Sequence, residues 1–256
     1  MRLTVVGCSG SFPGPASPAS CYLLQAEHEG RTFNLLLDLG SGALGALQHH
    51  LAPWDVDAVV LTHLHPDHCL DLCGLYVALT YRPEGTAPAR PLPVLGPSGT
   101  PERIARAYGA ADSEAVRGIF DFGALAHAKP IELGPFTLTP YRVNHPVEAY
   151  GFRVEAGGAV LAYTGDTDTC EALDPLCRNA SLVLADSAFI DGRDDATGIH
   201  LSGRRAAEAA LGAGGVQRLM LTHLPSWNDP EVCRSQAAAV WPGEVELAEP
   251  GATYEL

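Results

Sequence analysis

The chain has 256 residues, of which 46% are hydrophobic, and its formal net charge is −14. This length and composition are typical of one large globular domain, and we expect a single domain across residues 1–256. The acidic balance argues against a protein that mainly holds an extended nucleic acid, because that task needs a basic face. A small anionic substrate stays compatible, since bound metal ions would supply positive charge locally.

The order of strand and helix patterns is mixed, with an early run of strands and a later alternation of strands and helices. Short apolar runs predict buried strands at residues 3–6, 33–37, 58–61, 137–143, 159–162, 182–184 and 219–221. Helical patterns cover residues 70–81, 101–108 and 203–212, and the Pro- and Gly-rich residues 83–101 predict a surface loop. This order predicts an α/β protein with sheets flanked by helices.

Two of these strands share a near-repeat. Residues 59–64 read VVLTHL and residues 219–224 read LMLTHL, so each apolar strand breaks at Thr-His. The near-repeat indicates two similar halves packed face to face.

The seven cysteines are scattered, and no CxxC pair is present. The first residues lack the apolar segment and cleavage site of a signal peptide, and no run of about 18 apolar residues could span a bilayer. Free thiols are typical of a reducing compartment. The sequence therefore predicts a cytoplasmic protein without a membrane segment.

The strongest chemical signal is HLHPDH, which contains His63, His65, Asp67 and His68. The motif lies between a predicted buried strand and a predicted helix, so a turn there can direct all four side chains into one small space. Neutral imidazole and carboxylate are good ligands for Zn²⁺ and similar ions. A His-rich surface turn is the plainer alternative, but four potential ligands within six residues argue against it.

Three further candidate ligands follow the ends of predicted strands. They are His145, Asp166 in TGDTD, and His223. Loops that follow strands are where α/β proteins gather functional groups. Taken singly, they are equally compatible with a loop residue, a turn-capping Asp and a core histidine; together with HLHPDH they indicate a metal site.

Seven ligands exceed what one tetrahedral zinc ion uses, so we expect two divalent ions. The first ion would take His63, His65 and His145. The second would take Asp67, His68 and His223, and Asp166 would bridge the two ions. Zinc is the expected metal, with Mn²⁺ and Fe²⁺ as alternatives. Two ions about 3.5–4 Å apart can activate a water molecule and clamp a substrate oxygen.

The ordered set of HLHPDH, a lone His, a GD pair and a final His after a strand resembles the metallo-β-lactamase superfamily over nearly the whole chain. The resemblance implies an αββα sandwich of two related halves, in agreement with the near-repeat. Asp38, in LLLDLGSG, matches the family's early Asp, which supports the ligand loop.

The C-terminal third resembles the ribonuclease Z and phosphodiesterase branch of that superfamily. Asp186, in LVLADSAF, stands where the branch has Glu, and the segment at His200 and Ser202 stands where it has His-Ser-Thr. The resemblance implies that Asp186 orients His200, which contacts the phosphate and assists the leaving oxygen. Two departures from the branch affect the geometry around His200: Ala185 replaces a common His, and Asp is shorter than Glu. The alternative is that Ser202 caps a helix and His200 is incidental.

The predicted catalytic residues are Asp67, Asp186 and His200. Candidate substrate contacts are Ser9, Ser202 and Trp227. Ser9 lies in the glycine-rich start GCSGSFPGP, which resembles the branch and could present backbone N–H groups to an anion, or simply form a turn. Trp227, in LPSWNDP, could stack on a base or serve only for packing.

Four segments resemble an actinobacterial group of atypical class II cyclic-nucleotide phosphodiesterases: the GCSGS start, HLHPDHCLDLCGLY, HLSG and LTHLPSW. This resemblance implies cyclic AMP as the substrate and homodimerisation. A ribonuclease Z that processes the 3′ end of tRNA has the same ligands, but many such enzymes insert a tRNA-binding arm between the lone His and the GD pair. Here only 20 residues separate His145 from Asp166, and no PxKxxR-like loop occurs. A thioester, lactone or β-lactam hydrolase is a third hypothesis, and a non-catalytic metal-stabilised scaffold is a fourth.

Overall fold

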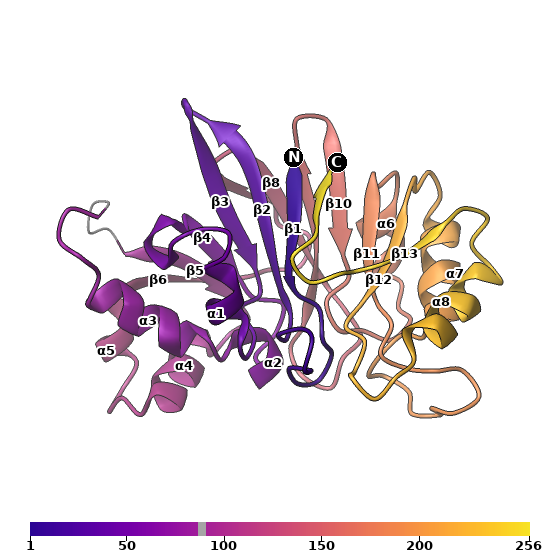
Figure 1. Cartoon of the computed structure of the whole chain (residues 1–256), viewed down its shortest axis with the longest axis horizontal. Coiled ribbons are helices and arrows are strands. Elements are labelled where there is room, and N and C mark those ends of the chain that lie inside the picture. The colour runs from indigo at the N-terminus through magenta and orange to yellow at the C-terminus, as the bar shows by residue number, and fades with distance from the viewer. Residues whose placement is uncertain (87–90) are drawn as a thin grey trace.

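Two sheets lie face to face in the computed structural model, which describes residues 1–86 and 91–256. Within these residues each sheet has seven strands, and helices cover its outer face (Figure 1). The layers form an αββα sandwich, as the sequence predicts.

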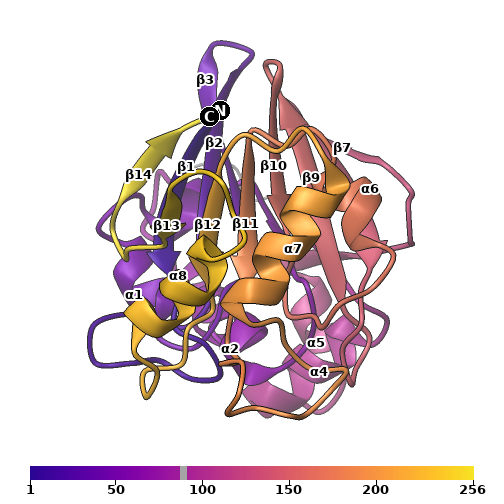
Figure 2. The ribbon, with the colours of Figure 1, turned by 90° about the vertical axis from the view of Figure 1, so that its right-hand side faces the viewer.

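The first sheet has the strand order β14-β1-β2-β3-β4-β5-β6. Its strands are β1 (Arg2–Gly7), β2 (Cys21–His28), β3 (Arg31–Leu37), β4 (Ala58–Val60), β5 (Leu92–Gly96), β6 (Phe120–Ala124) and β14 (Thr253–Glu255). The strands from β3 to β6 are parallel, whereas β14, β1, β2 and β3 pair antiparallel. Because β14 pairs with β1, the two ends of the chain lie side by side (Figure 2).

The second sheet has the order β13-β12-β11-β10-β9-β8-β7. Its strands are β7 (Ile131–Leu133), β8 (Phe136–Arg142), β9 (Tyr150–Ala156), β10 (Ala159–Tyr163), β11 (Leu182–Asp186), β12 (Leu219–Thr222) and β13 (Val245–Leu247). The strands from β10 to β13 are parallel, so their carboxyl ends meet at one edge of the sheet.

Helices complete the outer layers. On the side of the first sheet lie α1 (Ala43–Leu47), the 3₁₀ turn η1 (Pro53–Asp55), α2 (Pro66–Cys69), α3 (Leu72–Thr80), α4 (Thr100–Tyr108) and α5 (Glu114–Arg117). On the side of the second sheet lie α6 (Leu173–Cys177), α7 (Gly203–Ala213) and α8 (Pro230–Ala238) (Figure 2). No helix in the described parts of the chain is long and apolar enough to cross a membrane.

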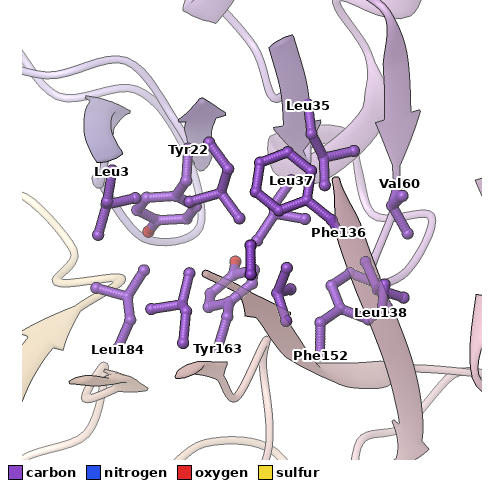
Figure 3. Close-up of a cluster of buried hydrophobic side chains, with 14 of the residues drawn as sticks. Leu3, Tyr22, Leu35, Leu37, Val60, Phe136, Leu138, Phe152, Tyr163 and Leu184 are labelled. Atoms are coloured by element: carbon purple, nitrogen blue, oxygen red, sulfur yellow. The ribbon is translucent and has the colours of Figure 1, made fainter. Parts of the chain in front are cut away.

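The period of two along each strand divides its side chains between layers. Leu35 and Leu37 of β3 face the second sheet, where they join Phe136 and Phe152 in the central core (Figure 3). Leu36, between them, faces the helices instead. Apolar burial on both faces of the sheet therefore explains why β3 reads as a continuous hydrophobic run.

The predicted strands and helices occur at their expected places, and the two near-repeat segments contain β4 and β12, one in each sheet. The loop prediction for residues 83–101 is wrong in part, because β5 lies inside it. Pro93 hides this strand, since proline rarely sits within a sheet. It is tolerated here because the register between β4 and β5 begins only at Val94. Residues 87–90 of that predicted loop lie outside the described residues.

Candidate metal centre

The candidate ligands gather at one edge of the sandwich. His63, Asp166 and His223 follow the ends of β4, β10 and β12, each within a few residues. His145 follows β8 in the same way. Strand ends therefore bring together residues that are up to 160 positions apart in the sequence.

The second half of HLHPDH is helical. Asp67 and His68 lie in the short helix α2, which begins at Pro66, a residue suited to the first position of a helix. The helix thus begins inside the motif rather than after it. Its turn directs both side chains inward, and both are buried.

His63, His65 and His145 form the first group of ligand atoms. His65 Nδ1 lies 2.9 Å from His63 Nε2 and 3.2 Å from His145 Nε2. The other nitrogen of His145, Nδ1, is 2.9 Å from the carbonyl oxygen of Ile199. Such a carbonyl fixes the ring orientation and leaves Nε2 free for a metal.

Asp67, His68, Asp166 and His223 form the second group. His223 Nε2 lies 3.2 Å from Asp67 Oδ2 and 3.3 Å from Asp166 Oδ2. Asp166 Oδ1 lies 3.2 Å from His68 Nε2, while its Oδ2 is 3.7 Å from His63 Nε2 in the first group. Asp166 therefore lies between the groups, where the sequence predicts a bridging carboxylate.

The residues fit divalent metal ions. Asp166 Oδ1 and His223 Nδ1 are buried and form no well-aligned hydrogen bond with any described residue, although His68 Nε2 lies 3.2 Å from Asp166 Oδ1. A buried carboxylate is costly unless it is paired or coordinates a metal. In each group the ligand atoms all lie within 4.8 Å of one another. Imidazole and carboxylate in two such sets suit a dinuclear site.

Burial and charge favour the metal-binding protonation state at His63 and Asp166. Burial lowers the pKa of His63 well below its ordinary value, and the neighbouring His68 lowers it further. Burial alone would raise the pKa of Asp166, but His223 and His68 hold it well below its usual range. Neutral imidazole and ionised carboxylate are the forms that ligate metals. At His68 and His223 burial lowers the pKa, but the surrounding carboxylates raise it above its ordinary value, so a metal ion would have to displace a proton from each imidazole.

Residues 34–224 match the family model of the beta-lactamase superfamily domain. The chain belongs to the metallo-β-lactamase superfamily. It is a metallo-hydrolase of that superfamily, with relatives among the ribonucleases Z.

Three relatives illustrate this membership. Uncharacterized protein Rv1339 of Mycobacterium tuberculosis is 42% identical over 100% of this chain and 92% of its own length. The probable metallo-hydrolase YhfI of Bacillus subtilis is 30% identical over the full length of both chains. Its crystal structure superposes with a TM-score of 0.88 at 29% identity, covering 100% of this chain and 99% of YhfI. Ribonuclease Z of Mycobacterium bovis is 29% identical over 96% of this chain and 95% of its own.

Asp38 supports the loop that contains the HLHPDH ligands. Its carboxylate lies 2.8 Å from His68 Nδ1 and accepts hydrogen bonds from the Thr62 amide at 2.7 Å and the Tyr163 hydroxyl at 2.9 Å. Asp38 is fully buried and has a φ of 60°, a left-handed conformation that Asp adopts more readily than most residues. It thus orients His68 through the nitrogen that faces away from the second group.

His200 lies beside the two ligand groups and contacts Asp186. His200 Nδ1 is 2.9 Å from Asp186 Oδ2, and its ring packs 5.6 Å from that of His145, centroid to centroid. Burial lowers the pKa of His200, but the charge and hydrogen bond of Asp186 outweigh burial and raise it. Asp186 also accepts hydrogen bonds from the amides of Thr167 and Ala188, both at 3.1 Å. The shorter Asp therefore still reaches the imidazole.

The three candidate substrate contacts differ in exposure. Ser9 is buried and its hydroxyl donates to the carbonyl oxygen of Phe12 at 2.8 Å. Ser202 is buried at the start of α7, where its hydroxyl accepts a hydrogen bond from the Arg205 amide. Ser202 is thus a helix cap, the alternative considered above. Trp227 is 60% exposed.

Sequence reasoning missed Asp168, the second acid of TGDTD. This buried carboxylate accepts hydrogen bonds from the Gly198 and Thr169 amides and from the Arg205 guanidinium. The only signal was its place two residues after Asp166. Its partners come from a loop and a helix that the sequence does not show to be adjacent.

Proposed function

We propose that this metallo-hydrolase is a dinuclear phosphodiesterase that hydrolyses 3′,5′-cyclic nucleotides, such as cyclic AMP, to 5′-nucleotides. The pairing of His200 with Asp186 beside the two ligand groups carries this proposal. A metal-dependent hydrolase in general needs the ligands. A partly buried imidazole held next to them adds a proton donor for a leaving oxygen.

In this proposal His63, His65 and His145 hold one ion. Asp67, His68 and His223 hold the other, and Asp166 is shared. Zinc is the ion we expect, and when bound the two ions would activate water and offset the charge that develops on the phosphoryl oxygens. Asp67 is thus both a ligand and essential for turnover.

His200 would act on the leaving group. Because the carboxylate of Asp186 accepts the Nδ1 proton, Nε2 is the nitrogen available to the substrate. A proton passed from Nε2 to the departing 3′ oxygen would complete the cleavage of the P–O bond. Asp186 would keep the ring oriented and stabilise its positive charge before the transfer.

The substrate should be small. Between His145 and Asp166 the chain forms only the hairpin of β9 and β10, so no arm extends from this position to hold a tRNA. The net charge of −14 also disfavours an extended nucleic acid. A tRNA 3′-end endonuclease remains the first alternative because of the ribonuclease Z relatives. A thioester or lactone hydrolase is the second, and it would need the ligands but not His200.

The test is turnover of cyclic AMP, bis(p-nitrophenyl) phosphate and a precursor tRNA by zinc- or manganese-loaded protein. We expect 5′-AMP as the product. His200→Ala should keep both metals and lower kcat by about 10²–10⁴-fold. His49→Ala, which removes an exposed histidine at the end of α1, is the matched control and should leave kcat unchanged. Cleavage of tRNA alone would favour ribonuclease Z. A metal-replete protein inactive on all three would refute the proposal.

A further inference from the structure

We propose that Phe12 and Trp227 form a stacking platform for the base of the nucleotide substrate. The inference rests on the proposed phosphodiesterase function and extends it, because it assigns the recognition of the base to named residues. It predicts that a phosphodiester with a base is preferred over one without.

The two rings are exposed and touch each other. Phe12 is 43% exposed and Trp227 is 60% exposed, although large aromatic side chains in this protein are commonly buried. Their ring centroids are 5.2 Å apart and their planes meet at 42°. The pair thus presents an apolar aromatic surface to solvent, which is the kind of surface on which nucleobases stack.

This surface adjoins the metal centre. Phe12 lies in the glycine-rich loop, where the preceding residue, Ser11, has its amide nitrogen 3.4 Å from His223 Nε2. That nitrogen is the one that faces Asp67 and Asp166. Adjacent Cα atoms are about 3.8 Å apart, so the Cα atom of Phe12 lies about that far from Ser11, the residue that contacts His223.

The two loops are joined along their backbones. The Gly10 amide donates to the carbonyl oxygen of Leu224 at 3.1 Å, and Ser9 forms a bridge with the same residue. A Cβ atom on Gly10 would lie 2.2 Å from the carbonyl oxygen of His223, so only glycine allows this approach. The close contact fixes Phe12 relative to the loop that carries Trp227.

Each ring also has local support. The Ser9 hydroxyl donates to the carbonyl oxygen of Phe12, and the Phe12 amide donates to that of Gly10, both at 2.8 Å. Next to Trp227, the Asn228 side chain donates to the carbonyl oxygen of Ala188 at 2.8 Å. These bonds hold the backbone of the platform in place before a ligand arrives, which lowers the entropic cost of binding.

A nucleotide matches this arrangement. Its phosphate is anionic and suits the metal centre, while its base is flat and suits an aromatic surface. The ribose would lie between the metal centre and the two rings. A protein-binding role for the same rings would not depend on whether the substrate has a base, and the test uses this difference.

The experiment compares cyclic AMP with methyl riboside 3′,5′-cyclic phosphate, in which a methoxy group replaces the base. Trp227→Ala should raise KM for cyclic AMP about tenfold and change KM for the base-free diester less than twofold. Trp227→Phe should restore most of the loss, and Phe12→Leu should give a smaller rise. Tyr81→Ala, which removes a 77% exposed aromatic ring at the end of α3, should change neither value.

The outcomes separate the two proposals. Equal effects of Trp227→Ala on both substrates, or none on either, would overturn the platform while the phosphodiesterase stands. If the metal-loaded wild-type protein hydrolyses neither substrate, the phosphodiesterase proposal fails. The affinities for 5′-AMP and for ribose 5-phosphate are then compared to test the platform. Tighter binding of 5′-AMP that Trp227→Ala abolishes would support a base platform; equal affinities would overturn it.

Discussion

The buried carboxylate of Asp168 accepts a hydrogen bond from the backbone amide of Gly198 at 2.7 Å. This contact joins the segment that carries Asp166 to the loop that leads into His200. The Arg205 guanidinium, from α7, contacts the same carboxylate at 2.5 Å. One side chain thus fixes the position of the proposed proton donor relative to a proposed metal ligand.

Asp168→Asn should weaken this junction. Asn offers one acceptor oxygen instead of two and no charge for Arg205, so we expect the free energy of unfolding to fall by about 1–3 kcal/mol. A small displacement of His200 should lower kcat about tenfold without loss of metal. Denaturant unfolding, steady-state kinetics and elemental analysis measure the three quantities.

Asp195→Asn is the matched control, because Asp195 is exposed in the loop that contains Gly198. It makes the same change of charge and should leave stability and kcat unchanged. If Asp168→Asn lost metal, or if both variants behaved alike, the junction would not act by placing His200.

Removing a ligand of the second group should remove one metal ion. Asp67→Ala and His68→Ala each delete an atom that lies within 4.8 Å of the other ligands of that group. We expect about one ion per chain instead of two, and loss of turnover, because a single ion cannot clamp both oxygens of the reacting phosphate. Inductively coupled plasma mass spectrometry gives the metal content. Two ions and a normal rate in either variant would contradict the assignment.

The sequence predicts the ligand groups well because their geometry follows from local structure. His63, Asp166 and His223 each lie within three residues of a strand end, and strand ends in an α/β sandwich meet at one edge. Buried strands such as β3 are equally visible, because a continuous apolar run has few other structural explanations at that length.

Contacts between distant loops could not be predicted in this way. The Asp168–Gly198 bond joins two irregular segments, and no periodicity encodes their register. Ser202 shows the same limit, because a helix cap and a substrate contact use the same residue type. Pro93 is a third case. Proline is rare within strands, so Pro93 conceals β5, although β5 pairs with β6 on both sides of this residue.

Asp38 should control metal affinity through His68. Asp38→Asn keeps the size of the side chain and tolerates the left-handed backbone, but it weakens the acceptor for His68 Nδ1. We expect zinc affinity to fall about 10–100-fold, as is usual when the partner of a ligating histidine is lost. Competition with a chromophoric chelator measures this affinity.

Tyr163→Phe is the companion variant. It removes the hydroxyl that donates to Asp38 at 2.9 Å but leaves the contact between Asp38 and His68 intact. We expect a loss of about 1 kcal/mol in the free energy of unfolding and a smaller change in zinc affinity. Equal zinc affinities in Asp38→Asn and wild type would show that Asp38 serves only the fold.

Two glycines near α1 allow a matched comparison of backbone crowding. A Cβ atom on Gly40 would lie 1.9 Å from the carbonyl oxygen of Asp67, whereas one on Gly45 would meet nothing within 4 Å. Gly40→Ala should therefore push the backbone of α2 away, lower the free energy of unfolding by about 1–3 kcal/mol and weaken the second metal group. Gly45→Ala, inside the helix, should stabilise the protein by about 0.5–1 kcal/mol, because alanine loses less entropy there. Thermal unfolding and metal content of the two variants test this contrast, and a Gly40→Ala protein with normal stability and both metals would show that α2 can move without disturbing Asp67.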